Sequence, residues 1–134
     1  MATPYEDRLL PAPRPNPGDE PFFEAAVQRL LLIKHCPDCG RPHWYPRAVC
    51  PFCLSDRLEW CQAAGGGVIH TFSVTRRAGP PPYAIAYVML DEGVAMMTNI
   101  VDCDLDALRI GQRVRLVFKP TQDGGPPVPC FVPA

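Results

Sequence analysis

Two closely spaced cysteine pairs in this chain could hold a metal ion. The first pair reads Cys-Pro-Asp-Cys, the second reads Cys-Pro-Phe-Cys, and ten residues separate them. Thiolates are ligands that zinc prefers in structural sites, and two such turns can present four sulfurs to one tetrahedral ion. The pattern predicts one structural zinc ion bound by Cys36, Cys39, Cys50 and Cys53. Because the protein would fill all four positions, none remains for water or substrate.

Other interpretations of the paired cysteines stay open at the level of sequence. They are two disulfide bonds, a redox-active Cys-x-x-Cys pair, or four unrelated core cysteines. The separation between the pairs is shorter than the roughly 15–20 residues typical of related zinc sites, although it suffices for a tight hairpin. Iron is also chemically possible in a four-thiolate site. We interpret Cys61, Cys103 and Cys130 as small buried residues, and His35 as a strand residue.

The charge balance limits the classes of function. The chain has 134 residues, with 13 Lys and Arg against 14 Asp and Glu and a formal net charge of −1. A protein whose main task is to hold a phosphate backbone usually carries a basic excess. No apolar run reaches the roughly 18 residues needed to span a bilayer, and residues 1–17 lack the order of a signal peptide. We therefore expect a cytoplasmic protein, in which reduced cysteines favour metal binding.

The N-terminal third predicts an extended arm followed by a helix. Residues 1–20 are rich in proline, which predicts an arm outside the core that is free to lie on a partner. Asp19 or Glu20 then caps a helix whose apolar residues recur at helical spacing through about residue 31. Phe22 and Phe23 lie about 100° apart around the helix axis, so we expect one ring to pack on this chain and the other to face a partner. The alternative is that the whole stripe packs inside the chain.

From residue 58 onward the pattern changes to short strands. Apolar runs and turn residues alternate at short intervals, which predicts a small barrel of about five strands, of the OB type. Val68, Phe72 and Val74 are expected to share one face of a strand, in which His70 interrupts the apolar set. Residues 91–93 join two apolar runs and predict a hairpin with glycine at a positive φ. The predicted strands are 58–62, 68–75, 83–90, 94–101, 113–118 and 128–132, with a helical turn at 104–109.

These elements define the expected fold class and domains. The chain is predicted to be mostly β, with an N-terminal helix, a zinc ribbon and a five-stranded OB-type barrel. The proline-rich arm occupies 1–20, the helix and ribbon 21–57, and the barrel 58–134.

No motif for catalysis or phosphate binding is present in the sequence. It lacks the Gly-x-Ser-x-Gly elbow, the Gly-x-Gly-x-x-Gly turn and the phosphate loop that ends in Gly-Lys-Ser/Thr. The three glycines at 65–67 precede a strand, whereas phosphate loops precede a helix. His43 and His70 have no evident nucleophile beside them. The sequence therefore predicts no catalytic residue.

The order of these motifs resembles a family of small acyl-CoA-associated proteins, in which a rubredoxin-like zinc ribbon precedes an OB fold. The resemblance covers about residues 21–132 and depends on order and spacing together. It rests on Pro-Phe-Phe-Glu-Ala at 21–25, both Cys-Pro-x-Cys pairs, Pro46, Leu-Glu-Trp at 58–60, the stretches 65–68 and 71–74, Pro-Tyr-Ala-Ile at 82–85, residues 91–93 and Leu-Arg-Ile-Gly at 108–111.

The resemblance implies a non-catalytic subunit in a hetero-oligomer with a thiolase-superfamily enzyme, such as an acyl-CoA thiolase, an acyltransferase or an aldolase. It implies that the ribbon and helix dock on the enzyme, while the barrel shapes acyl-CoA access. The four paired cysteines match the family's metal ligands. Arg76 and Arg77 form the only adjacent basic pair and are candidates for contact with the phosphates of CoA; the alternative is a solvated surface pair. A nucleic-acid-binding module is the alternative function, and it would need a basic groove with stacking aromatic residues.

Overall fold

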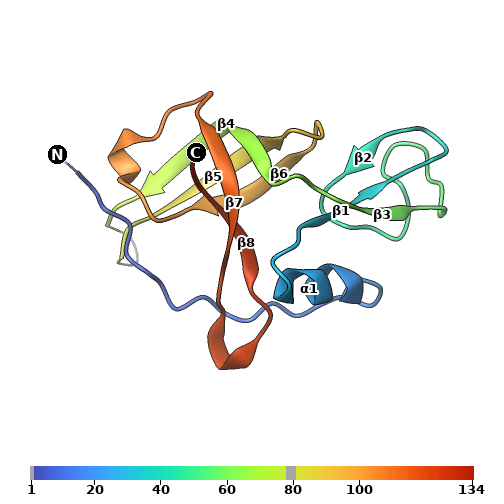
Figure 1. Cartoon of the computed structure of the whole chain (residues 1–134), viewed down its shortest axis with the longest axis horizontal. Helices are drawn as coiled ribbons and strands as arrows, with labels where there is room; N and C mark the ends of the chain where they lie inside the picture. The colour runs from blue at the N-terminus through green and yellow to red at the C-terminus, as the bar shows by residue number, and fades with distance from the viewer. Residues whose placement is uncertain (1, 78–80) are drawn as a thin grey trace.

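Two small β-structures form most of the chain, with one short helix beside the place where they meet (Figure 1). The computed structural model describes residues 2–77 and 81–134. The N-terminal β-structure is a three-stranded ribbon, and the C-terminal one is a closed five-stranded barrel. The predicted fold class, mostly β with one N-terminal helix, a ribbon and an OB-type barrel, is confirmed. Within the described residues, no helix has the length and apolar character needed to cross a membrane.

Helix α1 (Glu20–Val27) is shorter than the predicted apolar stripe. Asp19 is its N-cap, and a proline occupies the first turn, where its missing N–H costs no hydrogen bond. At the other end Arg29 adopts a left-handed conformation with φ of 64°. The N–H of Leu30 then donates to the carbonyl of Ala25 at 3.0 Å, which closes the helix in a Schellman motif. The prediction that the helix reaches residue 31 is therefore wrong, because a non-glycine residue makes the turn that ends it.

The ribbon sheet consists of β1 (Leu32–His35), β2 (Pro42–His43) and β3 (Glu59–Gln62), in the order β2-β1-β3. Strand β2 ends at His43, and Trp44 and Tyr45 leave the sheet and turn toward the helix. Their ring centroids lie 5.2 Å and 5.9 Å from that of Phe22. These aromatic contacts fix the ribbon against the helix.

The barrel contains β4 (Gly66–Thr75), β5 (Tyr83–Leu90), β6 (Ala95–Ile100), β7 (Arg113–Lys119) and β8 (Val128–Pro133). Its strand order is β4-β5-β6-β8-β7, which is the arrangement of an OB fold. Two short 3-10 helices, η1 (Leu105–Ala107) and η2 (Gln122–Gly124), lie in the connections. Each strand agrees with a predicted apolar run to within two residues at either end.

A bulge in β4 corrects one prediction about which residues share a face. The pairing of β4 with β5 shifts register between Ile69 and Thr71, and His70 is exposed at the shift. A bulge changes the side-chain parity of a strand. Ile69 therefore lies in the core before the bulge, and Phe72 and Val74 pack against the core after it. Val68 does not share their face, contrary to the sequence-based expectation.

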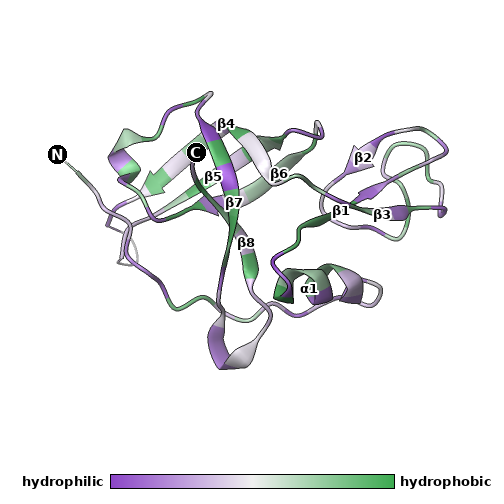
Figure 2. Cartoon of the chain, in the orientation of Figure 1, coloured by the Kyte–Doolittle hydropathy of each residue, from purple (hydrophilic) through white to green (hydrophobic). Residues whose placement is uncertain are grey.

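The hairpin between β5 and β6 has the predicted form. Gly93 has a φ of 86°, which a residue with a side chain rarely adopts. The N–H of Leu90 donates to the carbonyl of Val94 at 2.8 Å and closes the turn. Figure 2 shows hydrophilic and hydrophobic residues alternating in the first half of β7, as expected for a strand with one face in the core.

The proline-rich arm lies along this chain's own barrel. The N–H of Tyr5 donates to the carbonyl of Cys103 at 2.8 Å, and Asp7 accepts from the ammonium of Lys119 at 3.0 Å. The guanidinium of Arg8 lies 4.0 Å from the ring centroid of Tyr83. Main-chain and charged contacts hold these residues on β5 and β7 and on the loop after β6. Contact between the arm and a partner stays a prediction.

Candidate metal centre

Each cysteine pair lies in a tight turn, and the two turns share one hydrogen-bond pattern. The N–H of Gly40 donates to the carbonyl of Cys36 at 2.8 Å, and the N–H of Leu54 donates to the carbonyl of Cys50 at 2.9 Å. Both donors are left-handed, with φ of 77° and 67°. Glycine adopts this region without steric cost, but leucine does not. The second turn therefore keeps the geometry of the first in spite of its residue type.

The four sulfurs of these turns come together in one cluster. All four Sγ atoms lie within 4.8 Å of one another. Cys36 Sγ is 3.5 Å from Cys53 Sγ, and Cys39 Sγ is 3.7 Å from Cys50 Sγ. Four sulfurs bound at about 2.3 Å in a tetrahedron lie about 3.8 Å apart. The spacing therefore fits one structural metal ion with four thiolate ligands, as the sequence predicts.

Charge within the cluster shows why a cation fits. Burial raises the pKa of the Cys50 thiol. Hydrogen bonds from the backbone N–H groups of Phe52 and Cys53, together with those to the neighbouring sulfurs, outweigh burial and lower that pKa to about 7. The backbone N–H of Ser55 lowers the pKa of the Cys53 thiol. Cys36, burial and the other two sulfurs outweigh it and raise that pKa to about 12. Thiolates this close repel one another, so a positive charge between them favours the form in which all four are ionised. A metal ion supplies that charge.

Polar contacts hold the outside of the ribbon. Asp38, between the first two cysteines, accepts from the guanidinium of Arg57 and from the hydroxyl of Ser55. These two donors lower the pKa of the Asp38 carboxyl to about 2. His35 lies in β1, as expected, with its Nδ1 atom 3.2 Å from a carboxylate oxygen of Glu59. His35 is therefore engaged with β3 and not with the sulfur cluster.

The three remaining cysteines lie apart from the metal centre. Cys130 is buried in β8, and burial raises the pKa of its thiol to about 11. Cys61 and Cys103 are partly buried, and burial raises the pKa of each thiol. A thiol kept protonated is a poor nucleophile. These side chains act as small packing residues, as the sequence predicts.

The two histidines singled out in the sequence differ in environment. His70 is exposed at the bulge in β4. His43 is only 4% exposed, and neither of its ring nitrogens has a hydrogen-bond partner within the described part of the chain. Burial, with the nearby charges of Lys34 and Arg47, lowers the pKa of His43, so the imidazole is neutral. No sequence signal indicates that His43 is buried without partners.

The two candidate arginines lie at the end of β4, away from the metal centre. The guanidinium of Arg76 donates to the carboxylate of Asp106 at 3.1 Å, and its side chain is 53% exposed. Arg77 is exposed beside it. Contact between these arginines and CoA stays a prediction. In this ion pair, the carboxylate of Asp106 partly neutralises the positive charge of Arg76.

The two adjacent phenylalanines are both inside the chain. Phe22 is 2% exposed and Phe23 is 9% exposed. Their rings contact each other edge to face at a centroid distance of 5.0 Å, and Phe22 also contacts Trp44 and Tyr45. The expectation that one ring remains free is wrong, because the ribbon and barrel cover both sides of the helix start. A role for either ring at a protein interface stays a prediction.

The fold and the sulfur cluster together define a class: a rubredoxin-like ribbon with one closed four-cysteine site, joined to an OB-type barrel. Family models match both parts. Residues 23–59 match the model described as the rubredoxin-like zinc ribbon domain of ChsH2, and residues 60–119 match the C-terminal OB-fold domain of ChsH2. The chain belongs to the ChsH2/DUF35 family.

Curated relatives include scaffold proteins of archaea. The chain is 35% identical over 101 residues to a DUF35 domain-containing scaffold protein of Methanothermobacter thermautotrophicus, covering 71% of this chain and 76% of that protein. It is 36% identical over 112 residues to a probable enoyl-CoA hydratase alpha subunit of Thermomonospora curvata, covering 81% of this chain. The chain spans only 35% of that bacterial relative.

Solved structures share the same arrangement. A chain of the Ltp2-ChsH2(DUF35) aldolase superposes with a TM-score of 0.77 at 33% identity, covering 90% of this chain and 98% of that one. A DUF35-family protein of unknown function from Sulfolobus solfataricus superposes with a TM-score of 0.65 at 14% identity, covering 89% and 87% of the two chains. The second likeness shows the fold alone.

Proposed function

We propose that this chain is a non-catalytic, zinc-binding accessory subunit of a thiolase-superfamily enzyme, in which it helps to assemble the complex and to shape acyl-CoA access. The observation that carries the proposal is the family membership across both modules, ribbon and barrel. The solved relative at 33% identity is named as part of an aldolase with two named components, and the archaeal relatives are named as scaffold proteins.

The chemistry of the described residues supports a scaffold over an enzyme. A four-thiolate site has no open position at which a metal could activate water or substrate. The three other thiols have raised pKa values, and His43 is shielded from substrate by burial. Within the described ranges, these groups form no pairing of a nucleophile with a base. The purified chain alone should therefore show no thiolase, hydrolase or aldolase activity on acyl-CoA esters. Turnover that is lost on mutating His43 or His70 would contradict the proposal.

The decisive experiment is affinity purification of the tagged chain from its native host, with identification of the proteins that co-purify. We expect a thiolase-superfamily enzyme in a defined stoichiometry. The Thermomonospora relative makes an enoyl-CoA hydratase chain a second partner class to look for in the same sample. Adding the chain back to the separated enzyme should raise its activity or solubility. Recovery of nucleic acid alone, sensitive to nuclease, would favour the alternative of a nucleic-acid-binding module.

The role in acyl-CoA access rests on the basic pair at the end of β4. CoA carries phosphates, and adjacent guanidinium groups can hold a phosphate by charge and by paired hydrogen bonds. We expect the double substitution Arg76→Glu and Arg77→Glu to raise the KM of the complex for acyl-CoA and to leave assembly intact. Arg109→Glu, also exposed, is the matched control. An unchanged KM across salt concentrations would mean that both arginines are solvated surface residues without a role in binding CoA.

A further inference from the structure

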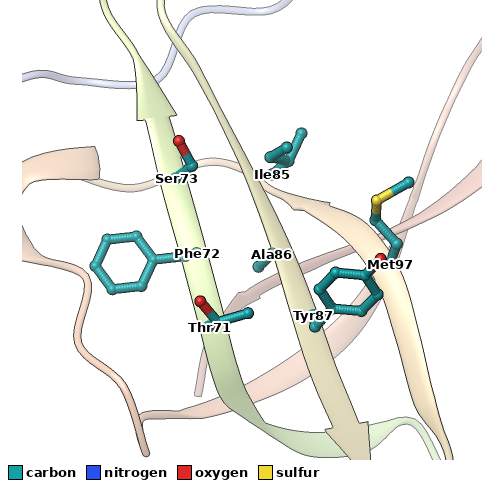
Figure 3. A pocket seen from close by; sticks show the side chains of 7 residues that line it. All are labelled: Thr71, Phe72, Ser73, Ile85, Ala86, Tyr87 and Met97. Atoms are coloured by element: carbon teal, nitrogen blue, oxygen red, sulfur yellow. The ribbon is translucent and has the colours of Figure 1, made fainter.

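The outer surface of the barrel carries an apolar patch that neither the core nor the metal centre explains. Ile85, Tyr87 and Met97 are 42%, 46% and 58% exposed. In the strand register, Thr71 on β4 pairs with Tyr87 on β5, and Tyr87 pairs with Met97 on β6. Residues paired across neighbouring strands point to the same face, so Thr71, Tyr87 and Met97 form one row. The barrel face, as we call Thr71, Ser73, Ile85, Tyr87 and Met97, is shown in Figure 3.

A pocket within the barrel face has the size of one large side chain. Its volume is about 160 Å³, and Phe72 and Ala86 complete its lining. An apolar cavity of about 150 Å³ holds a benzene molecule. The pocket can therefore accept one aromatic ring or one branched aliphatic side chain.

The barrel face continues into a second hollow through Met97. This groove, of about 320 Å³, lies where the arm, helix α1, the ribbon and strands β6 and β8 meet. Met97 lines both hollows, so their apolar surfaces are continuous. No lysine, arginine, aspartate or glutamate is among the described residues that line either hollow.

The lack of charged residues in the two hollows indicates which kind of molecule can bind there. Nucleic acid and the phosphates of CoA bind where cations neutralise them, so neither fits this surface. Aromatic residues and methionine are enriched in the cores of protein interfaces, from which charged residues are depleted. The surface around the exposed Phe52 of the ribbon differs, because cations lie beside it. The guanidinium of Arg41 lies 4.9 Å from the ring centroid of Phe52, and Arg47 lines the neighbouring groove. The barrel face is thus complementary to an uncharged protein surface.

We propose that the barrel face is the surface on which this chain holds its partner enzyme, and that the partner seats one large apolar side chain in the pocket beside Tyr87. The inference rests on the proposed function and deepens it, because it places the main contact on the barrel, whereas the family resemblance places docking on the ribbon and helix. The partner surface is apolar and uncharged. Tyr87 and Met97 are the residues whose loss weakens the contact most.

The test uses the enzyme recovered by co-purification as the probe. Its Kd is measured against the wild-type chain, Met97→Glu, Tyr87→Glu and the matched control Ile110→Glu, which is 70% exposed and lines neither hollow. A central interface contact is worth about 2 kcal/mol or more, which is roughly a 30-fold change in Kd. We expect both face variants to bind at least about 30-fold more weakly, and Ile110→Glu to bind like the wild type. Zinc content and melting midpoint confirm that each variant folds.

A second readout needs no substitution. In a spectrum of the wild-type complex with labelled methionine methyl groups, the Met97 signal should shift on binding. The signal of Met96, which is 1% exposed in the core, should not. Wild-type affinity in both face variants, or an unmoved Met97 signal in an intact complex, would overturn the proposal. An isolated chain that dimerises, and that Met97→Glu makes monomeric, would assign the face to a second copy instead. If the wild-type chain itself recovers no enzyme, the proposed function fails first, and that result is distinct from these.

Discussion

The ribbon and the barrel belong to one short chain, but different forces hold them. The barrel buries a continuous set of apolar side chains, among them Val88, Ile100 and Phe131, each with no exposed surface. The ribbon buries few side chains of its own: its three strands contribute Ile33 and His43, and its turns contribute the sulfurs of Cys36 and Cys50. Small modules that cannot bury enough apolar surface usually depend on a metal or a disulfide.

The comparison teaches where each kind of change should act. In the barrel, free energy comes mainly from apolar burial spread over many residues. In the ribbon, it is concentrated in one ion and in the turns that face it. Helix α1 joins the two, because Phe22 and Phe23 lie in one core cluster with Ile33 and the barrel residues. We therefore expect a substitution in the ribbon to change zinc content first, and a substitution in the barrel to change barrel stability first.

Loss of a metal ligand is the largest break that we expect. Cys36→Ser removes one of four thiolates, and structural zinc in a small module contributes on the order of 10 kcal/mol of folding free energy. The wild-type chain should contain about one zinc ion by elemental analysis, and the variant should contain almost none. In an amide spectrum the ribbon signals should collapse while the barrel signals remain.

The matched control for that prediction is Cys103→Ser, since Cys103 lies outside the sulfur cluster. It should keep full zinc content. Four free thiols titrating in a metal-free chain with an intact ribbon would contradict the metal-dependent account.

A substitution in the barrel core should lower the stability of the barrel and leave the metal centre intact. Ile100 has no exposed surface and lies at the residue pair that joins β6 to β8, where it pairs with Phe131. Ile100→Ala should lower the free energy of unfolding by roughly 2–5 kcal/mol, because a buried cavity is left behind. Urea unfolding followed by circular dichroism measures this change, and zinc content should stay at the wild-type level. The exposed Ile110→Ala should change stability by less than about 0.5 kcal/mol. Zinc loss from the folded Ile100 variant would mean that the two regions are not separable.

The strands were predictable because their signals are local. Apolar runs separated by turn residues located every barrel strand, and Gly93 located the hairpin turn. Paired cysteines likewise located the metal centre, since two turns with matching hydrogen bonds require little from the rest of the fold.

The parts that were missed depend on contacts distant in sequence or on unusual residues. Helix α1 is terminated by Arg29, which has a conformation that usually marks glycine. The bulge at His70 changes the parity of β4 without a glycine. The burial of Phe22 depends on Trp44 and Tyr45, about twenty residues away. The barrel face was also missed, although β5 consists entirely of apolar and aromatic residues. Continuous apolar strands are a signal that both faces are covered.

A buried histidine offers a smaller test within the ribbon. His43 has two ring nitrogens without partners in the described chain, and such atoms cost about 1–3 kcal/mol when buried. His43→Leu should therefore raise the melting midpoint at pH 7.5. The effect should grow at lower pH. The folded-state pKa of His43 lies below its unfolded value of about 6.5, so native stability is complete above that value and is lost as pH falls through the folded pKa.

The control for His43 is His70→Leu, because His70 is exposed. Melting midpoints of the wild type and both variants are compared at pH 7.5 and 5.5. Acid loss of zinc affects all three proteins alike, so the difference between variants isolates His43. An identical acid sensitivity in His43→Leu and the wild type would show that the imidazole is hydrogen-bonded in solution, for example through water.

The smallest expected effect compares the two metal-binding turns with each other. Leu54 holds a φ of 67° where the first turn has Gly40 at 77°, and its side chain is 77% exposed. A left-handed residue with a side chain costs about 1–2 kcal/mol, and the freer unfolded chain of a glycine offsets about 0.4–1 kcal/mol of that gain. Leu54→Gly should therefore stabilise the zinc-loaded ribbon by about 0.5–1 kcal/mol, seen as a higher midpoint and slower zinc release to a chelator. Gly40→Ala, with no neighbour within 4 Å of the added methyl, should destabilise it by a similar amount through backbone strain alone. If Leu54→Gly instead lowers the midpoint, the exposed side chain makes a stabilising contact that outweighs the strain. If it raises the midpoint as expected, Leu54 is retained for something other than the stability of the isolated ribbon, and its effect on enzyme binding becomes the next measurement.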